Sequence, residues 1–157
     1  MDRTQYRDAV AGNRRKHGFE PVDKRTNGFD PVWERREDDD SIGAVAVLAT
    51  LVDDEPDLGP EDLVATADSF RDVLVDRVDD RHGSTTPLGY VVFAVREPDP
   101  ALVDAARSYT VARRRTNVFP IVYDREAETL HRHEVPRLKG RGIYRRQADD
   151  ADRLFDV

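Results

Sequence analysis

The sequence predicts a small α/β sandwich with a mixed sheet, because uncharged apolar runs alternate with segments of helical periodicity. Two runs without any charged residue, 42–52 and 88–95, are typical of strands that are covered on both faces. An amphipathic segment follows each of them, and this alternation favours at least one right-handed crossover between strands of one sheet. We expect the chain to divide into an arm, 1–40, and a single α/β domain, 41–157.

The first 40 residues are expected to be poorly structured, extended or partly disordered. They carry nine basic and ten acidic residues, few apolar ones, and repeated Gly and Pro. Such a composition buries too little surface to offset the entropy lost on ordering. A tandem pattern of Gly, Phe, an acid, Pro and Val occurs at 18–22 and again at 28–32. The two copies either anchor the arm in a groove, on this domain or on a partner, or pack Phe19, Phe29 and Trp33 onto the chain's own domain.

The predicted domain begins with a strand, a helix and a second strand. The first strand is the apolar run 42–52. Gly59 and Pro60 then open a helix, because proline is favoured at the first helical position, and Gly83 ends it. The apolar side chains of this helix recur at helical spacing, namely Leu63, Ala67, Phe70, Leu74 and Val78. The run 88–95 is the second buried strand.

A second helix and two further strands follow. Asp99 is expected to cap this helix, with Pro100 as its first residue. The third strand covers 118–123, and Pro120 within it favours a sheet edge or a strand end, because proline cannot donate to a hydrogen-bond ladder. Thr129–Glu134 is expected to be the antiparallel partner of that strand.

The chain is expected to end with a loop at 136–142 and a short helix at 149–155. The resulting order, β-α-β-α-β-β with a proline near the start of the third strand, also occurs in thioredoxin-like folds. The sequence has no cysteine and no motif of that family. The similarity is therefore one of topology only.

Composition excludes several classes of protein. Without cysteine there is no disulfide scaffold, thiolate zinc site, iron–sulfur cluster or thiol catalysis. No apolar run approaches the roughly 20 residues that span a bilayer, and the first twelve residues lack the apolar stretch of a signal peptide. We therefore expect a soluble, cytoplasmic protein.

The kinds of charged residue predict an acidic protein of an extreme halophile, with an archaeal-type composition. There are 23 Asp but 9 Glu, and 22 Arg but only 3 Lys. Short carboxylates hold water and hydrated cations at a surface, whereas concentrated salt penalises the apolar stem of lysine. A GC-rich genome is the alternative explanation, and it accounts for the scarcity of Lys better than for the excess of Asp.

A basic segment within this acidic chain is the strongest candidate site. From Arg107 to Arg146 there are eleven basic and four acidic residues, a local charge of +7 in a chain of net charge −7. Arginine forks fit phosphate oxygens, and a tyrosine can stack on a base. The candidate anion-binding residues are Arg113, Arg114, Arg115, Arg137, Lys139, Arg141, Tyr144, Arg145 and Arg146. In the alternative, this segment pairs with the chain's own acidic first helix or with another subunit.

Carboxylates after the predicted strands form a weaker candidate for a metal site. They are Asp53, Asp54, Asp99 and Asp124. If the strands are parallel, these groups meet at one edge of the sheet and could hold Mg²⁺ for phosphoryl or phosphodiester chemistry. His131 and His133 form a second candidate, because side chains two residues apart lie on one face of a strand and can chelate a divalent metal.

Three functions are compatible with these patterns. The leading hypothesis is a non-enzymatic binding domain that contacts nucleic acid or a phosphate ligand through the basic segment, without a cofactor. The first alternative is a Mg²⁺-dependent hydrolase or nuclease that uses the strand-end carboxylates. The second is a structural subunit of a homo-oligomer.

Overall fold

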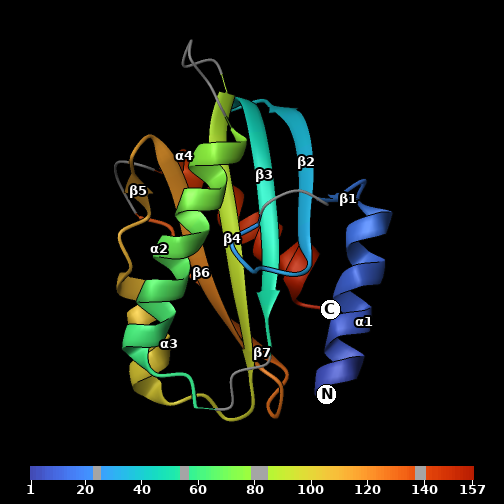
Figure 1. The fold of residues 1–157 in the computed structure, drawn as a ribbon, viewed down its shortest axis with the longest axis vertical. Coiled ribbons are helices and arrows are strands. Elements are labelled where there is room, and N and C mark those ends of the chain that lie inside the picture. The colour runs from blue at the N-terminus through green and yellow to red at the C-terminus, as the bar shows by residue number, and fades with distance from the viewer. Residues whose placement is uncertain (23–25, 54–56, 79–84, 137–140) are drawn as a thin grey trace.

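A seven-stranded mixed sheet lies between two layers of helices in the computed structural model (Figure 1). The structure describes residues 1–22, 26–53, 57–78, 85–136 and 141–157, with the side chain of Arg141 excepted. The strands are β1 (Glu20–Pro21), β2 (Val32–Asp39), β3 (Gly43–Val52), β4 (Thr85–Val95), β5 (Ala112–Arg113), β6 (Thr116–Asp124) and β7 (Thr129–His131). The helices are α1 (Arg3–Lys16), α2 (Pro60–Arg77), α3 (Pro100–Ser108) and α4 (Arg141–Asp150), which continues into a π-helical turn, η1 (Ala151–Phe155).

Three parallel strands, β3, β4 and β6, form the centre of the sheet. The strand order is β1-β2-β3-β4-β6-β5, with β7 also paired to β6. The outer strands β1, β2, β5 and β7 all pair antiparallel to their neighbours. The predicted α/β sandwich with a mixed sheet is therefore confirmed, including the antiparallel partner that follows the third predicted strand.

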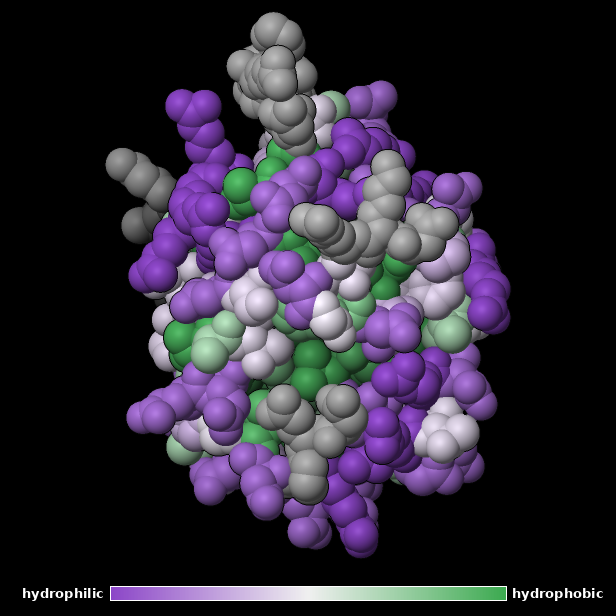
Figure 2. Space-filling view, in the orientation of Figure 1, coloured by the Kyte–Doolittle hydropathy of each residue, from purple (hydrophilic) through white to green (hydrophobic). Residues whose placement is uncertain are grey.

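The helices α2 and α3 cover one face of the sheet. Phe70 and Leu74 of α2 pack with Leu48, Val91 and other residues of this face. Close packing here requires Gly89 on β4, because a Cβ atom at that position would lie 2.5 Å from Cδ1 of Leu74. Among the described residues, Val64 is the only exposed large hydrophobic side chain, and hydrophilic side chains dominate the face shown in Figure 2.

The opposite face is covered by α1, α4 and η1. Tyr6 of α1 stacks on Tyr123 of β6 with ring centroids 4.0 Å apart, and its hydroxyl donates to the carbonyl oxygen of Phe155. Val10, Leu154 and Phe155 join the same cluster of buried residues. Alternate side chains of β3 therefore enter two separate cores, which explains its unbroken apolar run.

The first 40 residues differ from the extended or partly disordered arm expected from their composition. Asp2 and Gln5 form a capping box at the start of α1. At its end Gly18, with φ +79°, follows the C-cap, and the amide of Phe19 donates to the carbonyl of Arg14. A helix needs few apolar residues here, because only one narrow stripe of it is buried.

The tandem Gly-Phe-acid-Pro-Val pattern packs onto the chain's own domain, which is the second of the two alternatives. Phe19 lies in the core beneath α1 and α4, together with Trp33. Phe29 packs against the other core and meets Phe70 edge-on, with centroids 5.1 Å apart. The two copies thus anchor the chain on both faces of the sheet.

The end of the chain also differs from the prediction. Residues 149–155 are helical as predicted, but the helical segment of α4 and η1 begins already at Arg141, inside the loop predicted over 136–142. Residues 137–140 of that predicted loop lie outside the described residues. The buried stripe of the helical segment includes Gln147 and Asp150, and these polar residues mask the helical periodicity of the sequence. No helix in the described ranges is long and apolar enough to cross a membrane.

Pro120 lies at an open stretch of the sheet edge, as the sequence predicts. The amide of Val118 donates to Val111 on the outer side of β6, so the alternating backbone also turns residue 120 outward. On that side β5 pairs with residues 116–117 and β7 with residues 122–124. The missing N–H of Pro120 therefore faces the gap between β5 and β7, where no ladder requires it.

Candidate anion-binding surface

An arginine hairpin, Arg113–Arg115, connects β5 to β6. Arg113 pairs with Thr116, and the two residues between them, Arg114 and Arg115, have φ values of +50° and +60°. Two-residue hairpin turns of this kind favour Asn and Gly, which tolerate positive φ. A side chain with a Cβ in the left-handed region costs about 1 kcal/mol or more per residue. Arginine is thus present at two positions where the backbone alone would favour glycine.

The buried guanidinium of Arg71 on α2 holds this hairpin in place. Arg71 is only 2% exposed. Its Nη1 donates to the carbonyls of Arg113 (3.1 Å) and Thr116 (3.2 Å), and to Oγ1 of Thr116 (2.9 Å). Its Nη2 donates to the carbonyls of Thr110 and Val111, each at 2.9 Å. These bonds fix both strands of the hairpin to α2.

The side chains of the hairpin remain on the surface. Arg113, Arg114 and Arg115 are all exposed. Nη1 of Arg114 lies 2.6 Å from Oδ1 of Asp72, but both side chains are more than half exposed, and such pairs add little stability. Arg113 and Arg115 have no side-chain ion pair with any described residue.

The beginning of α4 lies near the same end of β6. The ring of Tyr144 meets that of Phe119 edge-on at 5.4 Å, and Phe119 is three residues beyond Thr116, about 10 Å along a strand. Arg145, the next residue of α4, is exposed. The fold therefore brings the hairpin and the start of α4 to one region. Arg137, Lys139 and the side chain of Arg141 lie outside the described residues.

Tyr144 packs against the sheet through its ring. Its ring packs edge-on against Phe119 and lies 6.0 Å from the ring of His133. The residue is half-buried. Its ring contributes to packing at the sheet edge, so the stacking role considered from the sequence stays a prediction.

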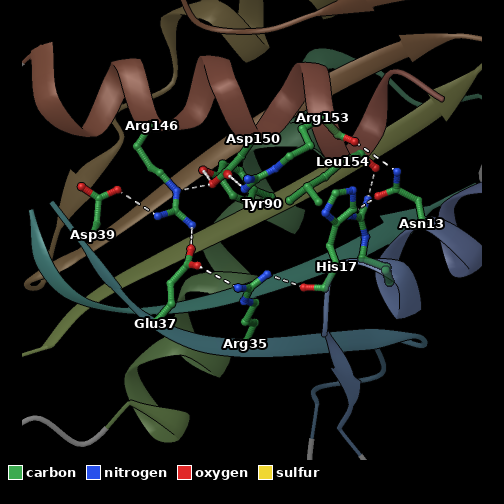
Figure 3. A network of polar contacts seen from close by, with 11 residues as sticks. Asn13, His17, Arg35, Glu37, Asp39, Tyr90, Arg146, Asp150, Arg153 and Leu154 are labelled. Carbon is green, nitrogen blue, oxygen red and sulfur yellow. Dashed lines mark hydrogen bonds and ion pairs between the residues drawn. The ribbon is translucent and has the colours of Figure 1, made fainter. Parts of the chain in front are cut away.

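Arg146 is withdrawn from the surface by an ion-pair network (Figure 3). Its guanidinium donates to Glu37, to Oδ2 of Asp39 (2.9 Å) and to Oδ2 of Asp150 (2.7 Å). Asp150 is fully buried and also accepts hydrogen bonds from Tyr90 and Arg153. Arg146 thus joins α4 to β2 and leaves the candidate surface.

The network also explains a shifted pKa. Burial alone would raise the pKa of Asp39, but the hydrogen bond from Arg146 and those from the amides of Ser41 and Ile42 hold it below its ordinary value. Asp39 is therefore ionised at neutral pH, where it compensates part of the positive charge of Arg146.

The strand-end carboxylates do lie at one edge of the parallel strands, but each described one has a structural partner. Asp53 accepts two hydrogen bonds from Arg7, at 2.9 and 2.8 Å, and lies 3.5 Å from Arg3. Asp99 caps α3 through the amide of Ala101, and Asp124 accepts from two amides of the following turn. Asp54 lies outside the described residues.

The two histidines do not share one strand, because β7 ends at His131. His133 is buried against Phe119 with ring centroids 5.6 Å apart. Burial lowers its pKa, although a hydrogen bond with the backbone of Ala106 acts in the opposite direction. His131 is half-buried in β7. Within the part of the chain that the structure describes, no group of three or more His, Asp or Glu side chains could hold a metal ion.

Arg71, which holds the hairpin, is the residue of this candidate surface that the sequence interpretation missed. A signal was present, because position 71 lies four residues after Ala67 and three before Leu74, on the apolar stripe of α2. An arginine on such a stripe either interrupts the apolar pattern of the helix or is buried and donates hydrogen bonds.

Comparisons with protein-family models, curated proteins and solved structures gave no match to this chain.

Proposed function

We propose that the chain is a non-enzymatic binding domain that contacts the phosphate groups of a nucleic acid through Arg113, Arg115 and Arg145. The observation that carries the proposal is the Arg71-supported hairpin. A buried guanidinium holds a strained turn that presents exposed arginines. Strain that the surrounding structure maintains is typical of functional loops.

The contacts expected are to the backbone of the nucleic acid and not to its bases. The three arginines offer forked donors that match phosphate oxygens. The one tyrosine near them is occupied by packing against Phe119. The domain should therefore bind with little sequence preference and with a marked dependence on salt.

The setting in this proposal is the salt-rich cytoplasm of a halophile, supported by the 23 Asp and 3 Lys of the sequence. At about 1 M ionic strength the Debye length is only about 3 Å. Long-range attraction to the polymer then vanishes, so binding must depend on direct arginine–phosphate contacts. A turn of fixed geometry suits that requirement, because its side chains lose less freedom on binding.

The test is a titration of a short fluorescent DNA duplex followed by anisotropy over a series of KCl concentrations, with circular dichroism to confirm folding at each. Three phosphate contacts predict that log K falls with log [KCl] with a slope of about −3. Arg115→Gln should reduce the slope by about one unit. Arg96→Gln is the matched control, since the side chain of Arg96 is 70% exposed and, among the described residues, pairs with Glu126 alone, at 3.0 Å.

The proposal fails if the protein does not bind the duplex at any KCl concentration. It also fails if the triple variant Arg113→Gln/Arg115→Gln/Arg145→Gln binds the duplex like the wild type. Light scattering on that triple variant addresses the homo-oligomer alternative. A loss of oligomers without any loss of DNA binding would assign the arginines to a contact between subunits.

A further inference from the structure

A cavity of about 750 Å³ lies at the other edge of the sheet, where α1, β1, β2 and the end of α2 meet. The hairpin lies at the β5–β6 edge, so this cavity is a separate feature. Cationic side chains dominate its wall, although the chain as a whole is acidic. The lining residues are Lys16, His17, Gly18, Glu20, Pro21, Glu34, Arg35, Arg36 and Arg77.

The wall combines four permanent cations with two carboxylates. The cations come from the end of α1, from β2 and from the end of α2, and the carboxylates are Glu20 and Glu34. The local charge is thus +2 before any protonation of His17. Three segments supply these charges around the outer edge of β2. Arg35 contacts the loop after α1 on one face of the sheet, whereas Arg36 and Arg77 meet at Glu34 on the face that α2 covers.

Glu34 orients two of the arginines without using all their donors. Its Oε2 accepts from Nε and Nη2 of Arg77, at 3.2 and 2.9 Å, and its Oε1 accepts from Nε of Arg36 at 3.3 Å. Both Nη atoms of Arg36 and Nη1 of Arg77 have no partner among the described residues. Nζ of Lys16 likewise has none there. Donors are therefore held at the cavity and remain available.

Arg35 fixes the position of the loop after α1. Its Nη1 donates to the carbonyl of His17, and its Nη2 lies 3.3 Å from Glu37 (Figure 3). This links the cavity wall to the ion pairs of Arg146 and makes it part of a rigid network. The wall should therefore change little when a ligand binds.

The cations around His17 also act on its imidazole. Its pKa lies below the ordinary value, first because of burial and then because Arg153, Lys16, Arg14 and Arg35 repel a proton there. A bound anion would offset that repulsion. His17 is thus a built-in reporter of negative charge in the cavity.

The cavity favours a compact and very polar ligand. Its volume is in the range of small-molecule sites, but Pro21 is the one apolar side chain among its lining residues, and the imidazole of His17 is the one aromatic ring. Nothing there would hold a base or an acyl chain. Forked donors and an ammonium group suit phosphate oxygens.

We propose that this cavity binds a small anion carrying two or more linked phosphate groups, of the pyrophosphate or tripolyphosphate kind. Titration calorimetry with tripolyphosphate, pyrophosphate, orthophosphate and citrate tests the class. The affinity should fall in the order given for the phosphates, and citrate should bind more weakly than pyrophosphate. In NMR spectra, pyrophosphate should raise the pKa of His17.

The double variant Lys16→Gln/Arg36→Gln should weaken pyrophosphate binding about tenfold or more, because it removes unpartnered donors and leaves Glu34 paired with Arg77. Arg96→Gln should bind like the wild type. The triple variant of Arg113, Arg115 and Arg145 should keep pyrophosphate binding, which separates this inference from the proposed function. No binding of pyrophosphate or tripolyphosphate, citrate binding as tight as pyrophosphate, or an unaffected Lys16/Arg36 variant would overturn the inference.

Discussion

The arginine hairpin and the first turns of α4 are equally basic in sequence but opposite in structure. At the hairpin, three consecutive arginines are exposed, and the buried Arg71 contacts their backbone. At α4, neighbouring arginines diverge, since Arg145 is exposed and Arg146 is enclosed by three carboxylates. A run of basic residues therefore does not by itself predict a positive surface.

The difference follows from the carboxylates within reach of each segment. The side chain of Arg146 meets acids that β2 and α4 present on the buried side of the helix. The hairpin projects from an edge of the sheet, where Asp72 is the one acid paired with it among the described residues. Position in the fold thus decides whether an arginine stabilises the protein or remains available to a partner.

The largest effect on stability that tests this comparison is expected from Arg146→Leu. The substitution leaves Glu37, Asp39 and the fully buried Asp150 without their main partner, which typically costs about 3–5 kcal/mol of unfolding free energy. Urea unfolding followed by circular dichroism measures it. Arg146→Lys should recover only part of the loss, because one ammonium group cannot reach all three carboxylates.

The neighbouring Arg145→Gln is the matched control for that experiment. The side chain of Arg145 is exposed, so its substitution should change the unfolding free energy by no more than about 0.5 kcal/mol. Equal losses in the two variants would contradict the division of α4 into a buried and an exposed arginine.

A smaller effect is expected from pH at His133, which contacts Phe119 of β6 and Tyr144 of α4. Its pKa is lowered in the folded protein, so the unfolded chain binds the proton more readily. Stability should be complete above the ordinary histidine pKa of about 6.5 and should fall as pH drops below it, by no more than about 1.4 kcal/mol per pH unit.

Urea unfolding between about pH 7 and pH 5 measures this slope, because carboxylates titrate mainly below that window. His133→Gln should flatten it. His17→Gln is needed in parallel, since the pKa of His17 is lowered as well. A slope that is unchanged in both variants would show that the pKa of His133 is not lowered. The imidazole would then not be desolvated by its burial between β6 and α4.

The smallest expected change is an increase in stability, in contrast to the losses predicted above. Arg115→Gly places glycine at φ +60° and should raise the unfolding free energy by up to about 1 kcal/mol, while DNA binding weakens as it does for Arg115→Gln. Thermal unfolding and anisotropy on the same sample measure both quantities. A variant that is less stable than the wild type would remove the argument from backbone strain.

The sequence predicts the central fold because its strands are buried on both faces. An apolar run such as 42–52, rich in β-branched residues, favours a buried strand over a buried helix, and the residues Pro60 and Asp99 mark where α2 and α3 begin. The helix α1 was missed because its buried stripe of Tyr6, Val10 and Arg14 contains an arginine. The signals that could have identified it are the capping box and the glycine after its last turn.

The candidate site could be predicted less well, because charge pairing depends on the tertiary fold. Sequence spacing alone gives no sign that Arg146 meets Glu37, more than a hundred positions away, or that Tyr144 packs on Phe119. The cavity has the same origin, since Lys16, Arg36 and Arg77 belong to three distant segments. Only the hairpin is local, because its three arginines are consecutive in the sequence, and their role in binding stays a prediction.

The two edges of the sheet have a consequence for how copies of this protein can associate. One edge ends in the two-residue β1, which contains Pro21, and the other is divided around Pro120 between two short strands. Beyond β1, the outer side of β2 from Arg35 to Asp39 has no partner strand among the described residues, but every side chain of that stretch is charged, and charged edge strands resist amyloid-like stacking and strand exchange between molecules. At high cellular concentrations, any self-association would have to proceed through side-chain surfaces, whose affinity can be adjusted residue by residue and reversed by salt.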